Sequence, residues 1–306
     1  MTAVPLSANL RGAALMTFSM LAFAVEDVLI KTLSATLPAG QIVSAIGAGA
    51  ALAFTAWFVF TRQPVFVPEH RNGKVWLRAL FEVLGTMLFI SALIRMPVTL
   101  LSAIIQATPL VVAMGGALFL GQKVGWRRWA AILVGFAGVL LIIRPTADGA
   151  TLAVLLGIGG MFGLAGRDLA TRAITVPISG AHLSLHAFLV LIPAGALMCW
   201  IYGTPMIWPS LATWGALALC VGVALLAYLS IVAATRAGDA AFIASFRYTR
   251  MVFALILGVF ILKERPDAYT LIGVAIVIAA GVFTLLREAR QSSRLRRTSK
   301  ALPDPL

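Results

Sequence analysis

Charged residues are scarce in this chain of 306 residues. They make up 11% of the total, whereas soluble globular proteins carry about 25%. Hydrophobic residues make up 61% even before glycine is counted, and the mean hydropathy is +0.99. This composition excludes a soluble enzyme, a soluble nucleic-acid-binding protein and a disordered chain. It indicates an all-α polytopic membrane protein that lies in a lipid bilayer.

Acidic residues are especially few. Asp and Glu number 11 against 24 Lys and Arg, which gives a formal net charge of +13. In a soluble protein this excess would suggest a nucleic-acid partner. Here we expect no such partner, because Lys and Arg in short loops and in a tail set the orientation of a membrane protein.

Cysteine and catalytic motifs are also nearly absent. Cys199 and Cys220 lie in apolar surroundings without CxxC or histidine spacing, which favours buried packing thiols over a disulfide or a metal site. The sequence contains no phosphate-binding loop, dinucleotide fingerprint or nucleophile elbow. We therefore expect no cofactor, and we exclude an ATP-driven pump unless a separate subunit supplies the motor.

Long apolar runs are abundant, and a spanning helix needs about 20 such residues. The run 173–235 lacks Asp, Glu, Lys and Arg but is interrupted by the Gly/Pro-rich turn around residues 202–209, so it predicts two helices. Residues 22–24 resemble a signal-peptide cleavage site, but Glu26 and Asp27 follow at once, so we interpret this segment as a retained first helix. The predicted helices cover residues 10–31, 39–60, 75–94, 97–120, 127–143, 150–171, 180–201, 211–235, 240–262 and 268–286.

The distribution of Lys and Arg predicts the orientation. With the N-terminus in the cytoplasm, seventeen Lys and Arg fall on the cytoplasmic side and five on the outer side. Arg247 and Arg250 lie within a helix and are left out of that comparison. The bias places both termini in the cytoplasm.

The chain contains a weak internal repeat. A shift of 141 residues aligns Met20, Ala24, Asp27, Lys31 and Arg95 with Met161, Ala165, Asp168, Arg172 and Arg236. We predict a first repeat at 10–145, a second at 150–287 and a basic cytoplasmic tail at 288–306. Because each repeat has five helices, the second enters the membrane inverted. Inverted repeats are typical of transporters with a substrate site near the midplane.

Two segments carry a resemblance to a known family. They are FRYTRMVFALILGVFILKERPDAYTLIGVAIVIAAGVFTLLRE, from Phe246 to Glu288, and ALFLGQKVGWRRWAAILVGFAGVLLIIRP, from Ala117 to Pro145. Both are similar to helix junctions of the EamA branch of the drug/metabolite transporter superfamily. One departure is Gln122, which stands where the family usually has an acid, whereas Glu264 keeps that acid in the second repeat.

The resemblance implies the fold and a class of function. Members of this family have ten helices in two repeats and move amino acids, riboflavin, nucleotide-like metabolites and small amphiphiles, many of them outward. The aromatic and neutral amino-acid exporters are the most similar type, and riboflavin importers share much of the same pattern.

Ionisable residues inside the predicted helices give the candidate substrate site. Charges in the hydrocarbon region are costly unless they face a partner or water, so they mark functional sites. Arg247 and Arg250 share a helix face and can bind a carboxylate, and Glu82 can bind an ammonium group or hold an arginine. Gln106 and Tyr248 can donate hydrogen bonds to the substrate. The alternative is a Glu82–arginine pair that only fixes packing.

Charges near the helix ends give a gating hypothesis. Asp27 and Arg95 are expected at the outer end, and their repeat partners Asp168 and Arg236 at the inner end. If the halves rock, each end closes by drawing its own charges together. The alternative is that all four are ordinary interfacial charges.

A histidine pair and a glycine pair are two further patterns in the sequence. His182 and His186 have the spacing of two metal ligands, but no third ligand lies nearby in sequence, so we predict no metal. A proton-sensitive or interfacial pair is the preferred interpretation. Gly159 and Gly163 indicate close helix packing.

Together these features predict a secondary transporter in the bacterial inner membrane, most simply an amino-acid exporter that is a monomer or a weak homodimer. The alternative within the same fold is an importer of riboflavin or a nucleotide-like metabolite. A distant alternative is a membrane-embedded enzyme, which would need an acid/base pair or metal site that the sequence does not offer.

Overall fold

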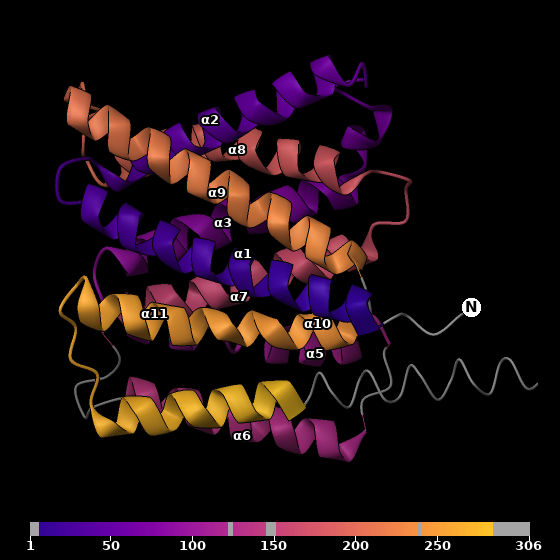
Figure 1. The fold of residues 1–306 in the computed structure, drawn as a ribbon, viewed down its shortest axis with the longest axis vertical. Coiled ribbons are helices and arrows are strands. Elements are labelled where there is room, and N and C mark those ends of the chain that lie inside the picture. Colours follow the sequence, from indigo (N-terminus) through magenta and orange to yellow (C-terminus); the bar gives the residue numbers. More distant parts are fainter. Residues whose placement is uncertain (1–5, 122–124, 145–150, 238–239, 284–306) are drawn as a thin grey trace, which may run out of the picture.

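The computed structural model describes residues 6–121, 125–144, 151–237 and 240–283, and these residues form helices joined by short loops (Figure 1). Eight helices are long and apolar enough to cross a membrane, and two shorter apolar helices accompany them. The all-helical membrane fold is thereby confirmed. The labelled helices are α1 (Leu6–Leu33), α2 (Ala39–Phe60), η1 (Pro68–Arg71), α3 (Gly73–Leu93), α4 (Val98–Ile105), α5 (Thr108–Phe119), α6 (Trp126–Ile143), α7 (Leu152–Ala173), α8 (Gly180–Ile201), α9 (Leu211–Ala237), α10 (Ala240–Ser245), η2 (Phe246–Tyr248) and α11 (Thr249–Phe260). The final described helix, Ala268–Phe283, is the yellow one at the bottom of Figure 1.

The fourth helix of each predicted repeat is interrupted. The expected helix at 97–120 is α4 followed by α5, with Gln106 and Ala107 between them. Pro109, the second residue of α5, lacks the N–H that would continue the helical hydrogen bonds. The expected helix at 240–262 is α10, a 3₁₀ turn and α11. Gln106 and Arg247, 141 residues apart, meet where these interruptions touch, because the Gln106 amide donates to the Arg247 carbonyl at 3.2 Å.

The two halves of the chain pack mainly through three helix pairs, α1 with α9, α3 with α7, and α2 with α8. In the repeat, α1, α2 and α3 correspond to α7, α8 and α9. The repeat therefore relates the α1–α9 pair to the α3–α7 pair, and it relates the α2–α8 pair to itself. Glycines let these backbones approach closely: a Cβ on Gly163 would lie 2.5 Å from the Gly85 Cα, and one on Gly47 would lie 2.9 Å from the Phe188 carbonyl oxygen. The packing role predicted for Gly163 is confirmed.

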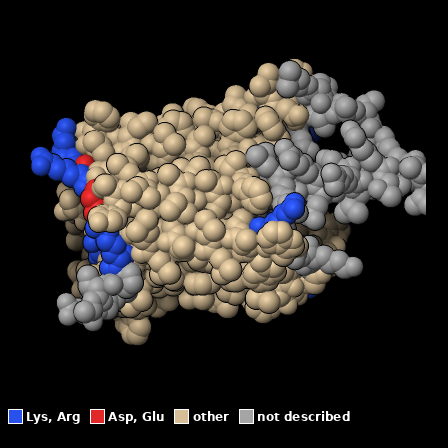
Figure 2. All heavy atoms as spheres, turned by 90° about the horizontal axis from the view of Figure 1, so that it is seen from below, with Lys and Arg blue, Asp and Glu red and all other residues tan. Residues whose placement is uncertain are grey.

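The surface has a wide uncharged band. Figure 2 shows Lys, Arg, Asp and Glu gathered at the ends of the helices, with uncharged atoms over most of the face between them. Large apolar side chains such as Leu52, Phe60, Leu133 and Leu211 are exposed on the bundle. This is the surface that a lipid bilayer requires.

Contacts between the halves close one end of the molecule. Glu264, just after α11, caps the start of α4, where it accepts hydrogen bonds from the Val98 and Thr99 backbone N–H groups at 2.6 and 3.0 Å. Ser91 and Tyr202 bring their hydroxyl oxygens to 2.7 Å, and Arg95 lies over the Tyr202 ring, 4.9 Å from its centroid. Helix starts attract carboxylates, so the Glu264 cap is a strong link between the repeats.

Candidate functional site

A cavity of about 530 Å³ lies between the two halves. Both repeats line it, through α1, α2, α3 and the α4–α5 interruption on one side and through α7, α8, α9 and the α10–α11 interruption on the other. A cavity at interrupted helices between inverted repeats is the usual position of a transporter substrate site. The charged residues that line it are Glu26, Asp27, Arg78, Glu82, Arg167, Asp168, Arg172, Arg247 and Arg250.

The cavity opens at the end opposite the closed one. Its exposed lining residues are Thr171, Arg172 and Thr235, which stand near the ends of α7 and α9, whereas Asp27, deep in the wall, is only 3% exposed. The end of α9 lies beside the start of α1 in a groove that Arg11 and Arg236 line. The opening is therefore at the N-terminal end of α1.

Arg250 is bound to Asp27. Its Nη2 donates to both carboxylate oxygens of Asp27, at 2.7 and 2.9 Å. The gating hypothesis grouped Asp27 with Arg95 at the outer end. In the structure Asp27 contacts Arg250, while Arg95 donates to the Ser91 carbonyl oxygen at the closed end. Asp27 thus contacts the adjacent helix α11 at a sequence separation of 223 residues, which helix spacing cannot reveal.

Glu82 belongs to a second network, with two other arginines. Arg78, one helical turn earlier, lies 3.4 Å from Glu82, and Arg167 of α7 lies 3.2 Å from it. Arg167 also donates through Nε and Nη2 to Asp168 Oδ1. Glu82 thus contacts two arginines, which agrees with one of the two roles predicted for it, that of holding an arginine. The i, i+4 spacing could have indicated Arg78, but Arg167 lies on another helix, and no spacing in the sequence links it to Glu82.

The two predicted hydrogen-bond donors are both buried. The Gln106 amide is engaged by the Arg247 backbone, and Gln106 is 7% exposed. The Tyr248 ring packs on Gly281, where an added Cβ would collide with the phenol, and the Tyr248 hydroxyl is buried without a hydrogen-bond partner among the described residues. Both residues line the cavity, but each also packs against a neighbouring part of the protein, which the sequence did not indicate.

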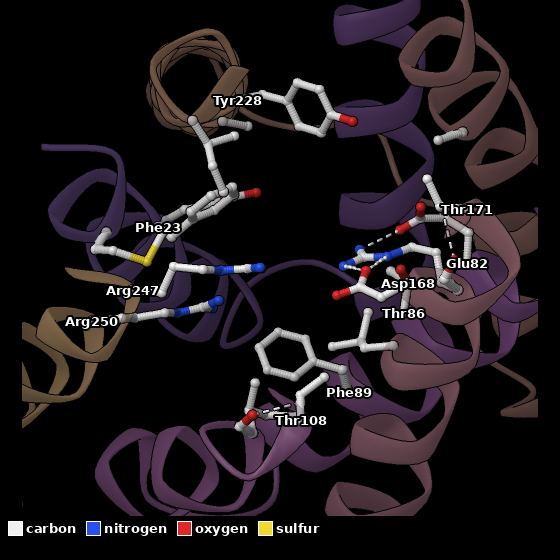
Figure 3. A pocket seen from close by; sticks show the side chains of 18 of the residues that line it. Phe23, Glu82, Thr86, Phe89, Thr108, Asp168, Thr171, Tyr228, Arg247 and Arg250 are labelled. Atoms are coloured by element: carbon white, nitrogen blue, oxygen red, sulfur yellow. Dashed lines mark hydrogen bonds and ion pairs between the residues drawn. The ribbon is translucent and has the colours of Figure 1, made fainter. Parts of the chain in front are cut away.

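Arg247 and Asp168 face each other across the cavity. Figure 3 shows the Arg247 side chain extending from one wall and the Asp168 carboxylate facing it from the other. Within the part of the chain that is described, Arg247 has no acidic group within 4.0 Å. Asp168 Oδ1 takes both hydrogen bonds from Arg167, which leaves Oδ2 without a donor among the described residues. Asp168 is not brought to Arg236, its expected gating partner.

Aromatic rings supply the apolar part of the walls. Phe23, Phe89 and Tyr228 point into the cavity in Figure 3, with the Tyr228 hydroxyl near its upper edge. Phe188 packs against Tyr228 with ring centroids 5.6 Å apart. Such rings can hold an apolar or planar side group, and they were absent from the residues chosen from sequence.

The two histidines of α8 join a third one near the open end. His186 stacks on His70 with centroids 5.5 Å apart, and a ring nitrogen of His182 lies 2.9 Å from the Pro64 carbonyl oxygen. Burial lowers the pKa of His70, which belongs to the loop before α3. Among the residues with described positions, no group of three or more His, Cys, Asp or Glu has a metal-binding arrangement. The histidines therefore connect this loop to α8.

Comparison with known families identifies the fold. The model of the EamA-like transporter family matches residues 10–144 and again residues 151–286. The chain belongs to the EamA-like transporter family. Membership makes it a multi-pass membrane transporter for small molecules, with one family match for each half of the ten-helix bundle.

Individual relatives of this EamA protein are distant. A "Riboflavin transporter" of Rhizobium johnstonii is 24% identical over 92% of this chain and 93% of its own length. A "Pseudopaline exporter CntI" of Pseudomonas aeruginosa is 25% identical over 88% of this chain and 94% of its own length. One solved structure is 20% identical, with a TM-score of 0.61 over 93% of this chain and 98% of that chain, which shows the fold alone.

Proposed function

We propose that this EamA transporter moves amino acids, or metabolites that contain an amino-acid group, outward across the bacterial inner membrane by alternating access. The observation that carries this proposal is the open pair of Arg247 and Asp168 on facing walls (Figure 3). An amino acid has a carboxylate and an ammonium group on one carbon. A cavity that excludes water must provide a counter-charge for each.

Each end of such a cargo has a suitable partner. The Arg247 guanidinium can bind the carboxylate through two parallel N–H groups, which is a strong and directional arrangement. Asp168 Oδ2 can accept from the ammonium group while Oδ1 stays with Arg167. The cargo's side group then lies against Phe23, Phe89 and Tyr228, which favours aromatic and neutral amino acids.

The opening of the cavity supports the outward direction in this proposal. The positively charged side of the chain, which we assign to the cytoplasm, is the side of the α1 start, and the cavity opens there. Cytoplasmic cargo can therefore load directly. We propose that Arg95 acts at the closed end and Arg236 at the open end, while Asp27 and Asp168 link the cargo site to these gates.

Riboflavin is the second candidate. The Rhizobium relative carries that name, and the cavity's aromatic rings could stack on a flat ring system. Riboflavin has no carboxylate and no ammonium group, however, so it would leave the Arg247–Asp168 gap without counter-charges.

Transport into liposomes that contain the purified protein tests the choice. We expect uptake of L-phenylalanine, and uptake at least about tenfold slower for its N-acetyl and amide derivatives, each of which loses one charge. Arg247→Lys keeps the charge but loses the planar fork, so it should slow uptake about tenfold or more. Arg127→Lys, at the exposed start of α6 outside the cavity, is the control. Equal uptake of all three compounds, or riboflavin uptake alone, would refute the amino-acid proposal.

A further inference from the structure

Glu26 differs from the other three carboxyl groups of the cavity. Asp27 accepts from Arg250 at 2.7 Å, Glu82 from Arg167 at 3.2 Å, and Asp168 from Arg167 at 2.8 Å. Glu26 also lines the cavity, but it has no ion pair within 4.0 Å and no hydrogen bond with any residue that the structure places. Its oxygens are not among the enclosed side-chain atoms that lack a partner, so they face open cavity space.

The surroundings of Glu26 provide no free cation. The charged or titratable groups near it are Asp27 on its own helix, Arg250 on α11 and the Cys220 thiol on α9. Arg250 already donates to both oxygens of Asp27. The helices α2 and α10 also pack against α1, and their sequences contain no Asp, Glu, Lys or Arg. Arg247, on the 3₁₀ turn beside α1, points instead toward Asp168 (Figure 3).

We propose that Glu26 binds a proton and that the transporter exchanges this proton for its cargo. A carboxyl group that lies beside a second carboxylate, with no cation of its own, is more stable when it carries a proton. Carboxyl groups in membrane-embedded cavities commonly serve as proton carriers for this reason.

The exchange conserves charge and atoms. In the empty cavity Glu26 is a neutral carboxylic acid. When cargo enters, Arg247 binds its carboxylate and Asp168 binds its ammonium group, so the cargo adds no net charge, but the nearby ammonium group favours the ionised form of Glu26. The O–H bond of Glu26 then breaks, the electron pair stays on the carboxylate, and the proton passes to water at the opening. The loaded cavity therefore carries one negative charge more than the empty one. After the cargo leaves on the other side, Glu26 takes up a proton there, and the empty cavity returns with its original charge.

The second repeat has no carboxyl group at the position that corresponds to Glu26. The 141-residue shift that aligns Asp27 with Asp168 also aligns Glu26 with Arg167. Arg167 bridges Glu82 and Asp168, so the second half of the molecule fills the corresponding position with a permanent cation. One proton for each cargo molecule is the expected ratio.

Infrared difference spectroscopy on the protein in lipid nanodiscs tests proton binding without any cargo. Between neutral and alkaline buffer, where water-exposed carboxyl groups stay ionised, we expect loss of the carbonyl band of a protonated carboxylic acid. Glu26→Gln should lack this signal, and Glu69→Gln, which changes a carboxyl group in the loop before α3, should keep it. A wild-type spectrum without the band, or an unchanged band in Glu26→Gln, would overturn the proposal.

Coupling rests on the proposed function and is measured in liposomes with L-phenylalanine and a trapped pH indicator. Each unit of pH difference should support about a tenfold gradient of phenylalanine in the wild type. In Glu26→Gln, whatever transport remains should be the same with and without the pH difference. Phenylalanine transport that ignores the pH difference in the wild type would overturn the exchange. If the infrared band of Glu26 is present but the protein does not transport phenylalanine, the amino-acid cargo is refuted and the proton site is still supported.

Discussion

At the scale of single residues, the cavity depends on which arginine each carboxylate binds. Arg78 and Glu82 stand one helical turn apart, so their pair could be read from sequence. The pairs of Asp27 with Arg250 and of Glu82 with Arg167 join helices of different repeats, and no local spacing encodes them. The sequence could therefore identify several charged residues of the cavity, but not the partners that they find in the other repeat.

The pair of Asp27 and Arg250 gives a prediction at this scale. Asp27→Asn leaves the Arg250 charge, whose side chain is 19% exposed, without its counter-charge. Loss of one partner of a buried ion pair costs about 3–5 kcal/mol. We expect a clearly lower unfolding temperature for Asp27→Asn in detergent, and partial recovery when Arg250→Gln is added.

The matched control is the exposed pair of Arg144 and Asp267, with side chains 41% and 51% exposed. Asp267→Asn should leave the unfolding temperature close to that of the wild type, because water screens exposed ion pairs. Asp27→Asn with wild-type stability would show that the cavity remains hydrated enough to compensate Arg250 without Asp27.

At the scale of helices, the apolar runs predicted the number and approximate bounds of the spanning segments. They did not predict the interruption at Phe246–Tyr248, because that segment contains neither proline nor glycine. The contact between the two interruptions follows from the packing of whole repeats. Helix interruptions of this kind depend on tertiary contacts rather than on local sequence.

The packing of α2 on α8 gives a prediction for a single methyl group. A Cβ on Gly195 would lie 2.2 Å from the Gly40 carbonyl oxygen and 2.3 Å from Ser44 Oγ, so Gly195→Ala must push the two helices apart. Overpacking of this kind costs about 1–3 kcal/mol. Gly222→Ala on α9 has no heavy atom within 4 Å of its new Cβ, so it should be neutral or slightly stabilising. Size-exclusion chromatography after heating measures the fraction of each variant that stays folded. We expect a smaller folded fraction for Gly195→Ala than for Gly222→Ala. Equal fractions would contradict the close approach of α2 and α8 at Gly195.

At the scale of the whole molecule, the structure changes the charge comparison without reversing it. Arg78, Arg167 and Arg172, which count toward the cytoplasmic side in that comparison, line the cavity. Without them the bias is fourteen to five, which still predicts a cytoplasmic N-terminus. In this predicted orientation the open end of the cavity would face the cytoplasm, and the end closed by Glu264 and Tyr202 would face outward.

Thiol labelling of intact cells tests this orientation, on which the proposed direction depends. Gly73, at the start of α3, has open space around its Cβ position, and Met206, after α8, is 49% exposed, so a cysteine fits at either position. The natural cysteines, Cys199 and Cys220, are buried and should give little background. A membrane-impermeant maleimide should label Met206→Cys in intact cells and Gly73→Cys only after the membrane is opened, since the Lys and Arg bias places residue 73 inside. The opposite pattern would reverse the molecule in the membrane, so the open cavity would face outside and the proposed outward direction would lose its support.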